Sequence, residues 1–146
     1  MISVKPGELV ICGENKIQFF ELNSRKLKEI ININRDIHWS CDNLLCMMNE
    51  RYLCVGGTDK ITIIDVYQKN IIREIEDKGV HFCLYKLNDN ILLSGKNYDI
   101  TQWKICQNNL TLISKKEKAH QNYIYKIIKF RKNIVTCSGD KSLKIW

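Results

Sequence analysis

The stretch "NIVTCSGDKSLKIW", residues 133–146, contains two short apolar runs joined by a glycine-containing turn. In each run apolar residues alternate with others, as in a half-buried β-strand. Gly139, Asp140 and Lys141 lie between the runs, and these residue types are typical of a tight turn. The stretch therefore predicts an antiparallel hairpin whose second strand ends on Trp146.

The same pattern recurs three times earlier in the chain. Trp146 falls on Trp103 after a shift of 43 residues and on Phe20 after a shift of 126. A shift of 82 residues places Gly139 on Gly57. The steps between successive units are therefore 44, 39 and 43 residues, a period that suits four short strands and their turns.

Each unit has the same internal order of strands. In the last unit, strands are expected at residues 125–130, 134–138 and 142–146. The equivalents of its third strand are KIQFFEL (16–22), KITIIDV (60–66) and DITQWKI (99–105). A fourth strand follows in the first three units, at residues 27–31, 71–75 and 110–114. The plan predicts four antiparallel meanders.

The segment "AHQNYIYKIIKFRKNIVTCSGDKSLKIW", residues 119–146, resembles the repeat of the WD-repeat β-propeller family, with Ala-His where the family has Gly-His. The resemblance implies an all-β fold of about four four-stranded antiparallel blades. The blades are expected at residues 1–34, 35–76, 77–118 and 119–146, the last without its fourth strand. Because propellers of this family close with about seven blades, we expect an open arc, part of a longer protein, and not a closed ring.

In this family, a His, a hydroxyl, an Asp and a Trp of one blade form a buried hydrogen-bonded set. The resemblance assigns these structural roles to His120, Thr136, Asp140 and Trp146. A buried carboxylate needs donors, and imidazole, hydroxyl and indole N–H groups supply them. The third unit keeps Trp103, but the same alignment places Leu93 at the hydroxyl position. We therefore predict one complete set.

The same residues could also be interpreted as a catalytic triad. His120 and Asp140 would be the base and its orienting carboxylate, with Thr136 as the nucleophile. Triads are recognised by geometry, however, and the propeller register already accounts for these residues. We therefore predict a protein that is not an enzyme and has no catalytic residue.

Two further patterns are weak as binding motifs. Residues 55–60, VGGTDK, lack the spacing of a phosphate-binding loop and lie between two strands. His38, Cys41 and Cys46 lack a fourth ligand for a metal, so packing of Cys46 in a strand is the preferred interpretation. No cofactor or metal site is predicted.

Composition limits the cellular setting. The 146 residues carry a formal charge of +7, but most basic residues are interspersed with carboxylates, which favours a solvated surface. The seven cysteines are odd in number and form no C-x-x-C pair, which indicates a reducing, intracellular compartment, the cytoplasm or the nucleus. No apolar run reaches the roughly 18 residues of a membrane span.

The resemblance also implies a use. Propellers of this family are rigid platforms whose variable loops bring proteins together. We expect a non-catalytic protein-interaction scaffold that assembles a multiprotein complex. Its candidate partner-binding residues are Trp39, Asn97, Tyr98, Lys118, Gln121 and Tyr123. Aromatic anchors beside positive charge suit a protein interface, but packing between blades explains Trp39 and Tyr123 equally well.

Two other properties follow from the same expectations. The +7 charge supports an alternative in which a basic surface binds nucleic acid or a phosphoinositide. An open arc leaves an apolar blade face bare at each end and an unpaired edge at residues 142–146. We therefore also expect self-association through the terminal blades.

Overall fold

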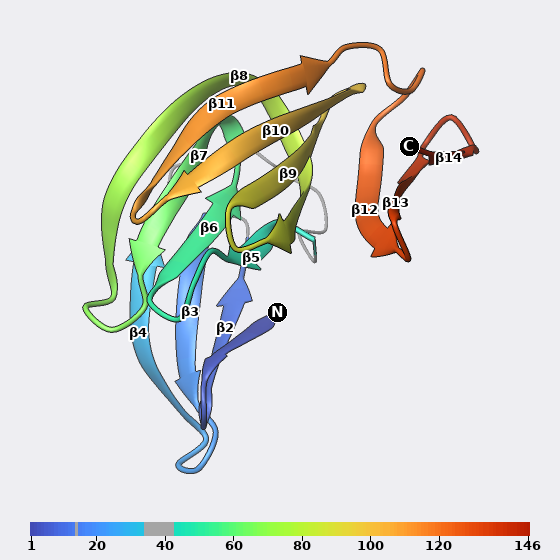
Figure 1. The fold of residues 1–146 in the computed structure, drawn as a ribbon. Helices are drawn as coiled ribbons and strands as arrows, with labels where there is room; N and C mark the ends of the chain where they lie inside the picture. Colours follow the sequence, from blue (N-terminus) through green and yellow to red (C-terminus); the bar gives the residue numbers. More distant parts are fainter. Residues whose placement is uncertain (14, 34–42) are drawn as a thin grey trace.

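The computed structural model describes residues 1–13, 15–33 and 43–146, and all the regular structure in these ranges is β-strand. The strands form three antiparallel sheets that follow chain order. Figure 1 shows the sheets arranged round an open arc, with the N-terminal sheet at one end and the C-terminal sheet at the other. The predicted all-β class and open arc are confirmed.

The first sheet is a regular four-stranded meander. It contains β1 (Ile2–Lys5), β2 (Glu8–Cys12), β3 (Lys16–Glu21) and β4 (Lys26–Asn32), in that order. Ile17 and Phe19 are fully buried, whereas Gln18 and Phe20 are only half-buried. Because successive side chains of a strand point to opposite faces, only one face of this sheet packs on the next sheet.

The second sheet joins two predicted units. Its strands are β5 (Leu45–Met47), β6 (Tyr52–Gly56), β7 (Thr58–Asp65), β8 (Asn70–Asn88), β9 (Ile91–Lys96), β10 (Asp99–Cys106) and β11 (Asn109–Lys116). The long β8 pairs with β7 as far as Val80 and with β9 from His81 onward. It therefore crosses the boundary expected at residues 76–77, where the sequence pattern suggests two separate strands.

The third sheet has three strands, β12 (Ile124–Phe130), β13 (Asn133–Ser138) and β14 (Leu143–Ile145). We call the units blades: blade 1 is β1–β4, and blade 2 is β5–β7 with residues 70–80 of β8. Blade 3 is residues 81–88 of β8 with β9–β11, and blade 4 is β12–β14.

A recurring irregularity supports this equivalence of blades. The pairing of the third and fourth strands shifts register immediately before Phe20, Ile64 and Trp103. These residues occupy one position of the repeat, and their spacings are the 44 and 39 residues of the sequence alignment. Such β-bulges increase the local twist of a strand pair, so each of these blades bends at the same point.

Apolar side chains pack between successive blades. Blades 1 and 2 share a cluster that includes Val10, Phe19, Leu53 and Ile64. The cluster between blades 2 and 3 includes Cys54, Ile63, Leu92 and Trp103. The cluster between blades 3 and 4 includes Cys83, Leu93, Ala119, Ile124 and Ile127. Burial of this apolar surface is what holds the arc together.

Candidate functional site

The four residues that the resemblance assigns to a hydrogen-bonded set come together at blade 4. Nδ1 of His120 lies 2.9 Å from Oδ2 of Asp140, and its Nε2 lies 2.7 Å from Oγ1 of Thr136. The Trp146 indole N–H donates to the same Thr136 oxygen at 3.0 Å. β13 supplies Thr136, the β13–β14 turn supplies Asp140, and His120 precedes β12.

The proton positions in this set follow from the donors and acceptors. Asp140 can only accept, so Nδ1 of His120 carries its proton and Nε2 accepts from the Thr136 hydroxyl. That hydroxyl in turn accepts from Trp146. A chain of three hydrogen bonds therefore runs from the indole to the carboxylate, with each bond polarising the next.

Asp140 is held in its ionised form. Its carboxylate accepts from the Ser142 hydroxyl at 2.6 Å and from the Ser142 and Gln121 backbone N–H groups at 2.9 Å each. These bonds, with the one from His120, hold the pKa of Asp140 well below its usual range. The turn that carries Asp140 is thus tied to the segment that precedes β12.

This geometry suits a structural role better than catalysis. The Thr136 side chain is fully buried, and its hydroxyl is already bonded to both His120 and Trp146. A nucleophile must reach its substrate, so an enclosed and fully bonded hydroxyl cannot serve as one without opening the blade.

Blade 3 keeps more of the set than the alignment suggests. The Trp103 indole N–H donates to the Ser94 hydroxyl at 3.0 Å, inside the buried region between blades 2 and 3. Leu93, which the alignment places at the hydroxyl position, points toward blade 4 instead. The assignment of Leu93 is therefore wrong, because the β9–β10 turn is one residue shorter than the β13–β14 turn.

In blade 3, the position equivalent to His120 is occupied by Asp77, which belongs to a different polar cluster. Asp77 forms an ion pair with Lys96, and its other oxygen lies 3.3 Å from Nε2 of His81. His81 is fully buried, and burial lowers the pKa of its imidazole to about 4, although the nearby Asp77 acts in the opposite direction. His81 is therefore neutral at physiological pH.

Five of the six candidate partner-binding residues occupy two adjoining segments, and Trp39 lies outside the described residues. Asn97 and Tyr98 form the β9–β10 turn, while Lys118, Gln121 and Tyr123 lie between β11 and β12. The two segments are joined by the backbone bonds His120 N to Tyr98 O and Ile124 N to Asn97 O, both 3.0 Å.

Aromatic rings gather where these segments meet. The rings of Tyr98 and Tyr123 are stacked with centroids 5.8 Å apart, and Phe82 stacks on Tyr123 at 4.4 Å. Tyr125 meets the edge of Phe82 at 6.0 Å. We call these four residues the aromatic patch. The three tyrosines are 39–47% exposed, so the rings pack on one another and still present a surface.

The polar candidates divide by role. The Asn97 side chain accepts from the Val80 N–H at 3.2 Å, and the Lys118 N–H donates to Asp99 at 2.9 Å. Asn97 and Lys118 both have φ near +50°, a conformation that is found mainly in turns. Their backbones therefore shape the two segments. Lys118 itself is exposed, in the segment that also carries Tyr123.

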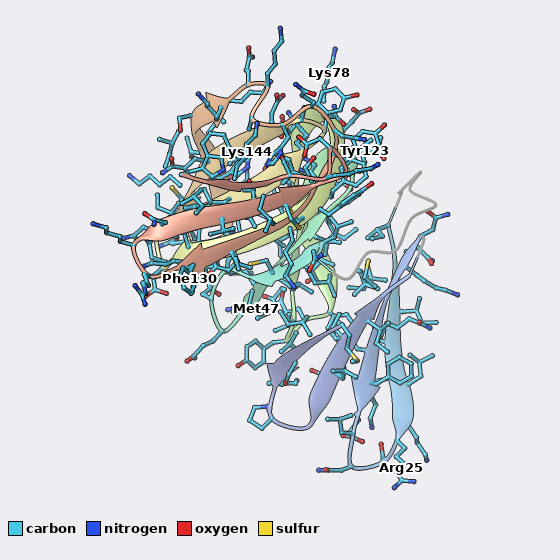
Figure 2. The ribbon with its side chains drawn as sticks, turned by 90° about the vertical axis from the view of Figure 1, so that its right-hand side faces the viewer. Arg25, Met47, Lys78, Tyr123, Phe130 and Lys144 are labelled. Carbon is cyan, nitrogen blue, oxygen red and sulfur yellow. The ribbon has the colours of Figure 1, made fainter. Side chains whose placement is uncertain are left out.

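Sequence reasoning missed two members of the patch. Phe82 and Tyr125 lie in strands, where an aromatic residue is ordinarily assigned to the core. The available signal was that Tyr125 directly follows Ile124, so one of these two adjacent strand residues must point away from the buried face. Figure 2 shows Tyr123 at the end of blade 4 opposite Phe130.

Two other classes of site find no support within the described ranges. No group of three or more His, Cys, Asp or Glu side chains in residues 1–13, 15–33 and 43–146 could hold a metal ion. Within the same ranges there is no helix long and apolar enough to cross a membrane.

Comparison with known proteins identifies the fold. A chain in the crystal structure of a mitotic checkpoint complex superimposes with a TM-score of 0.76 at 16% identity, covering 96% of this chain and 45% of that one. The computationally designed Ika4 and Ika8 proteins each match with a TM-score of 0.71 at 16% identity. Each match covers 97% of this chain, together with 86% of the Ika4 chain and 43% of the Ika8 chain. No family model and no curated protein matches the sequence.

These likenesses show a β-propeller fold, and at 16% identity they show the fold alone. The chain spans less than half the length of the mitotic checkpoint chain and of Ika8. The described residues accordingly form an open part of a propeller-type architecture. The specific resemblance to WD repeats rests on the sequence of blade 4.

Proposed function

We propose that this chain is a non-catalytic protein-interaction platform of the WD-repeat type, and that it binds its partners in a multiprotein complex through the aromatic patch. The observation that carries the proposal is the ring stack of Tyr98, Tyr123 and Phe82, in which the two tyrosines are exposed. Rigid, partly exposed tyrosines supply large contact areas at a small cost in conformational entropy, which is why they are enriched at interfaces.

The setting of the patch supports this use. Its rings come from β8, the β9–β10 turn and the segment around β12, which adjoining blades hold in fixed positions. Lys118, which is exposed, lies in the same segment as Tyr123. The partner that fits is therefore a protein segment with an apolar or aromatic anchor and nearby acidic side chains.

Affinity capture with matched variants tests the proposal. The full chain is compared with a Tyr98→Ser/Tyr123→Ser variant and with Tyr67→Ser, which changes an exposed tyrosine in the turn after β7. Proteins recovered with the wild type and with Tyr67→Ser, but lost with the double variant, support it. Equal recovery with the wild type and both variants would refute the patch as the binding surface.

The basic surface supports a second candidate function, binding of nucleic acid or a phosphoinositide. Lys126, Lys129, Arg131 and Lys132 are all exposed on or beside β12. Binding of this kind weakens steeply with salt because counterions are released. Such binding would survive replacement of Tyr98 and Tyr123 but not replacement of these four residues by serine. Binding through the aromatic patch would instead be lost when the two tyrosines are replaced and would survive replacement of the four basic residues.

We also propose a reducing intracellular location, the cytoplasm or the nucleus. Within the described residues, free thiols are found at Cys46, Cys54, Cys83, Cys106 and Cys137, and burial raises the pKa of the Cys83 thiol to about 12. Such thiols behave as small apolar groups. Fractionation of cells that express the tagged chain tests this location.

The partners also include a second copy of this chain. The sheets at the two ends of the arc each turn one apolar face to solvent: Leu143 and Ile145 are 72% and 70% exposed, and Leu27 and Ile30 are 44% and 40% exposed. Patches of this kind favour association.

A further inference from the structure

Blade 4 has two faces, and only one of them is packed. Ile124 and Ile127 point into the cluster shared with blade 3. The register of the sheet places Cys137 opposite Leu143 and Val135 opposite both Ile128 and Ile145. These residues form the other face, which we call the C-face and which also includes Phe130 and Lys126. Among them, a groove of about 310 Å³ with a mostly apolar lining is bordered by Lys126, Ile128, Val135, Cys137 and Leu143.

The C-face repeats positions that are buried between blades elsewhere in the chain. In blade 1 the pair Val10–Phe19 occupies the place that Val135–Ile145 occupies in blade 4. Val10 and Phe19 are fully buried against blade 2. The C-face therefore has the register and the apolar character of a face that packs on a following blade.

Blade 1 has the complementary free face. Leu9 pairs with Phe20, which pairs with Leu27, and Ile11 pairs with Gln18, which pairs with Ile30. We call the face that these residues form the N-face. In blade 2 the equivalent pair is Leu53–Ile64, and both residues are fully buried against blade 1. The N-face thus has the register of a face that packs on a preceding blade.

From these equivalences we infer that two copies of this chain associate head to tail, the C-face of one copy packing on the N-face of the other. The inference rests on the self-association proposed above and specifies its geometry. The contact would repeat the interface between blades 1 and 2. There, Val10 and Phe19, which are equivalent to C-face residues, share a cluster with Leu53 and Ile64, which are equivalent to N-face residues. Two different patches are used, so the association is heterologous.

A like-with-like contact between two copies is less favourable. Two C-faces brought together would place Lys126 of each copy in the contact, because its side chain lines the groove with Ile128 and Leu143. Two N-faces would likewise bring together Lys16 of each copy, because alternation places Lys16 on the same face as Gln18 and Phe20. Neither like-with-like contact reproduces the pairing of faces seen between blades 1 and 2.

Sedimentation of single variants and of their mixture tests this geometry. Ile145→Glu alters the C-face, Leu27→Glu alters the N-face, and Leu112→Glu is a control on the outer strand β11, where the side chain is 56% exposed. We expect the wild type and the control to exceed the mass of one chain at micromolar concentration. Each face variant alone should be monomeric, with a self-dissociation constant raised at least about tenfold.

The equimolar mixture of the two face variants is diagnostic. It should recover a dimer, because one intact C-face still meets one intact N-face. Leu143→Glu and Phe20→Glu provide a second pair of variants, and circular dichroism checks that each variant is folded. A wild type that stays monomeric would overturn both self-association and the head-to-tail geometry. A wild type that associates while Leu27→Glu also associates alone would overturn only the geometry.

Discussion

The indole of Trp103 donates a hydrogen bond to the Ser94 hydroxyl, with 3.0 Å between the nitrogen and the oxygen. Ser94 is fully buried and Trp103 is 4% exposed, so no water competes for this bond. In blade 4, Trp146 makes the same bond to Thr136 at 3.0 Å. In both blades, therefore, an indole-to-hydroxyl hydrogen bond links the second strand to the tryptophan at or after the third strand.

Removing the Ser94 hydroxyl should destabilise blade 3. Ser94→Ala leaves the Trp103 N–H without its partner in a buried site, which costs about 1–3 kcal/mol of unfolding free energy. Urea unfolding measures the loss, and Ser94→Thr, which keeps a hydroxyl, is the control. A double-mutant cycle with Trp103→Phe should show coupling between the two residues. Additive effects in that cycle would mean that the hydrogen bond does not contribute.

His120 should be essential to the stability of blade 4. His120→Ala removes one partner from both Asp140 and Thr136, two groups that the imidazole joins. We expect a loss of about 1–3 kcal/mol or more, since the group that accepts from the imidazole is a charged carboxylate. Thermal unfolding of the variant, followed by the fluorescence of Trp146 in a Trp39→Phe/Trp103→Phe background, measures it. An unchanged midpoint would contradict the structural role.

His81 should make the protein less stable in mild acid. Its folded pKa of about 4 lies below the model-peptide value of 6.5, so the unfolded chain takes up a proton at a pH where the folded chain does not. The unfolding free energy should therefore fall by up to about 3 kcal/mol as the pH drops from about 6.5 to 4.

The matched variant for this prediction is His81→Gln, which keeps polarity but cannot be protonated. Urea midpoints measured at several pH values between 7 and about 4 should fall less steeply for the variant than for the wild type. Parallel pH profiles would show that His81 does not carry the effect.

Gly95 should control the contact between blades 3 and 4. A Cβ at this position would lie 2.6 Å from the Cys83 sulfur and 3.0 Å from the Ile124 carbonyl oxygen. Because that oxygen belongs to the backbone of β12, blade 4 would have to shift, and Gly95→Ala should cost about 1–3 kcal/mol. Gly13→Ala, where the nearest atoms lie at 3.6 and 3.7 Å, is the control. Equal stability of the two variants would argue against close packing at Gly95.

Much of the fold was predictable because the repeat fixes register. The alignment of Phe20, Ile64 and Trp103 holds in the structure, since all three follow a bulge in the same strand pair. Alternating apolar residues then determine which face of each strand is buried. The all-β class and the arc follow from these local rules.

The features that the sequence did not predict also have local causes or depend on tertiary packing. A one-residue difference in turn length moves the hydroxyl position from Leu93 to Ser94, and a gapless alignment cannot detect it. The long β8 changes partners next to Gly79, whose φ of 120° is a conformation that glycine adopts readily and that the repeat pattern does not reveal. The membership of Phe82 and Tyr125 in the aromatic patch depends on how two adjoining blades approach, which is a tertiary property.

The central claim is that the aromatic patch, and not the basic surface, binds the protein partner. The most direct test is the dissociation constant of a captured partner, measured by titration calorimetry at low and high salt. The Tyr98→Ser/Tyr123→Ser variant should bind at least about tenfold more weakly than the wild type at both salt concentrations. Unchanged binding by this variant, with a loss only when Lys126, Lys129, Arg131 and Lys132 are replaced, would contradict the claim.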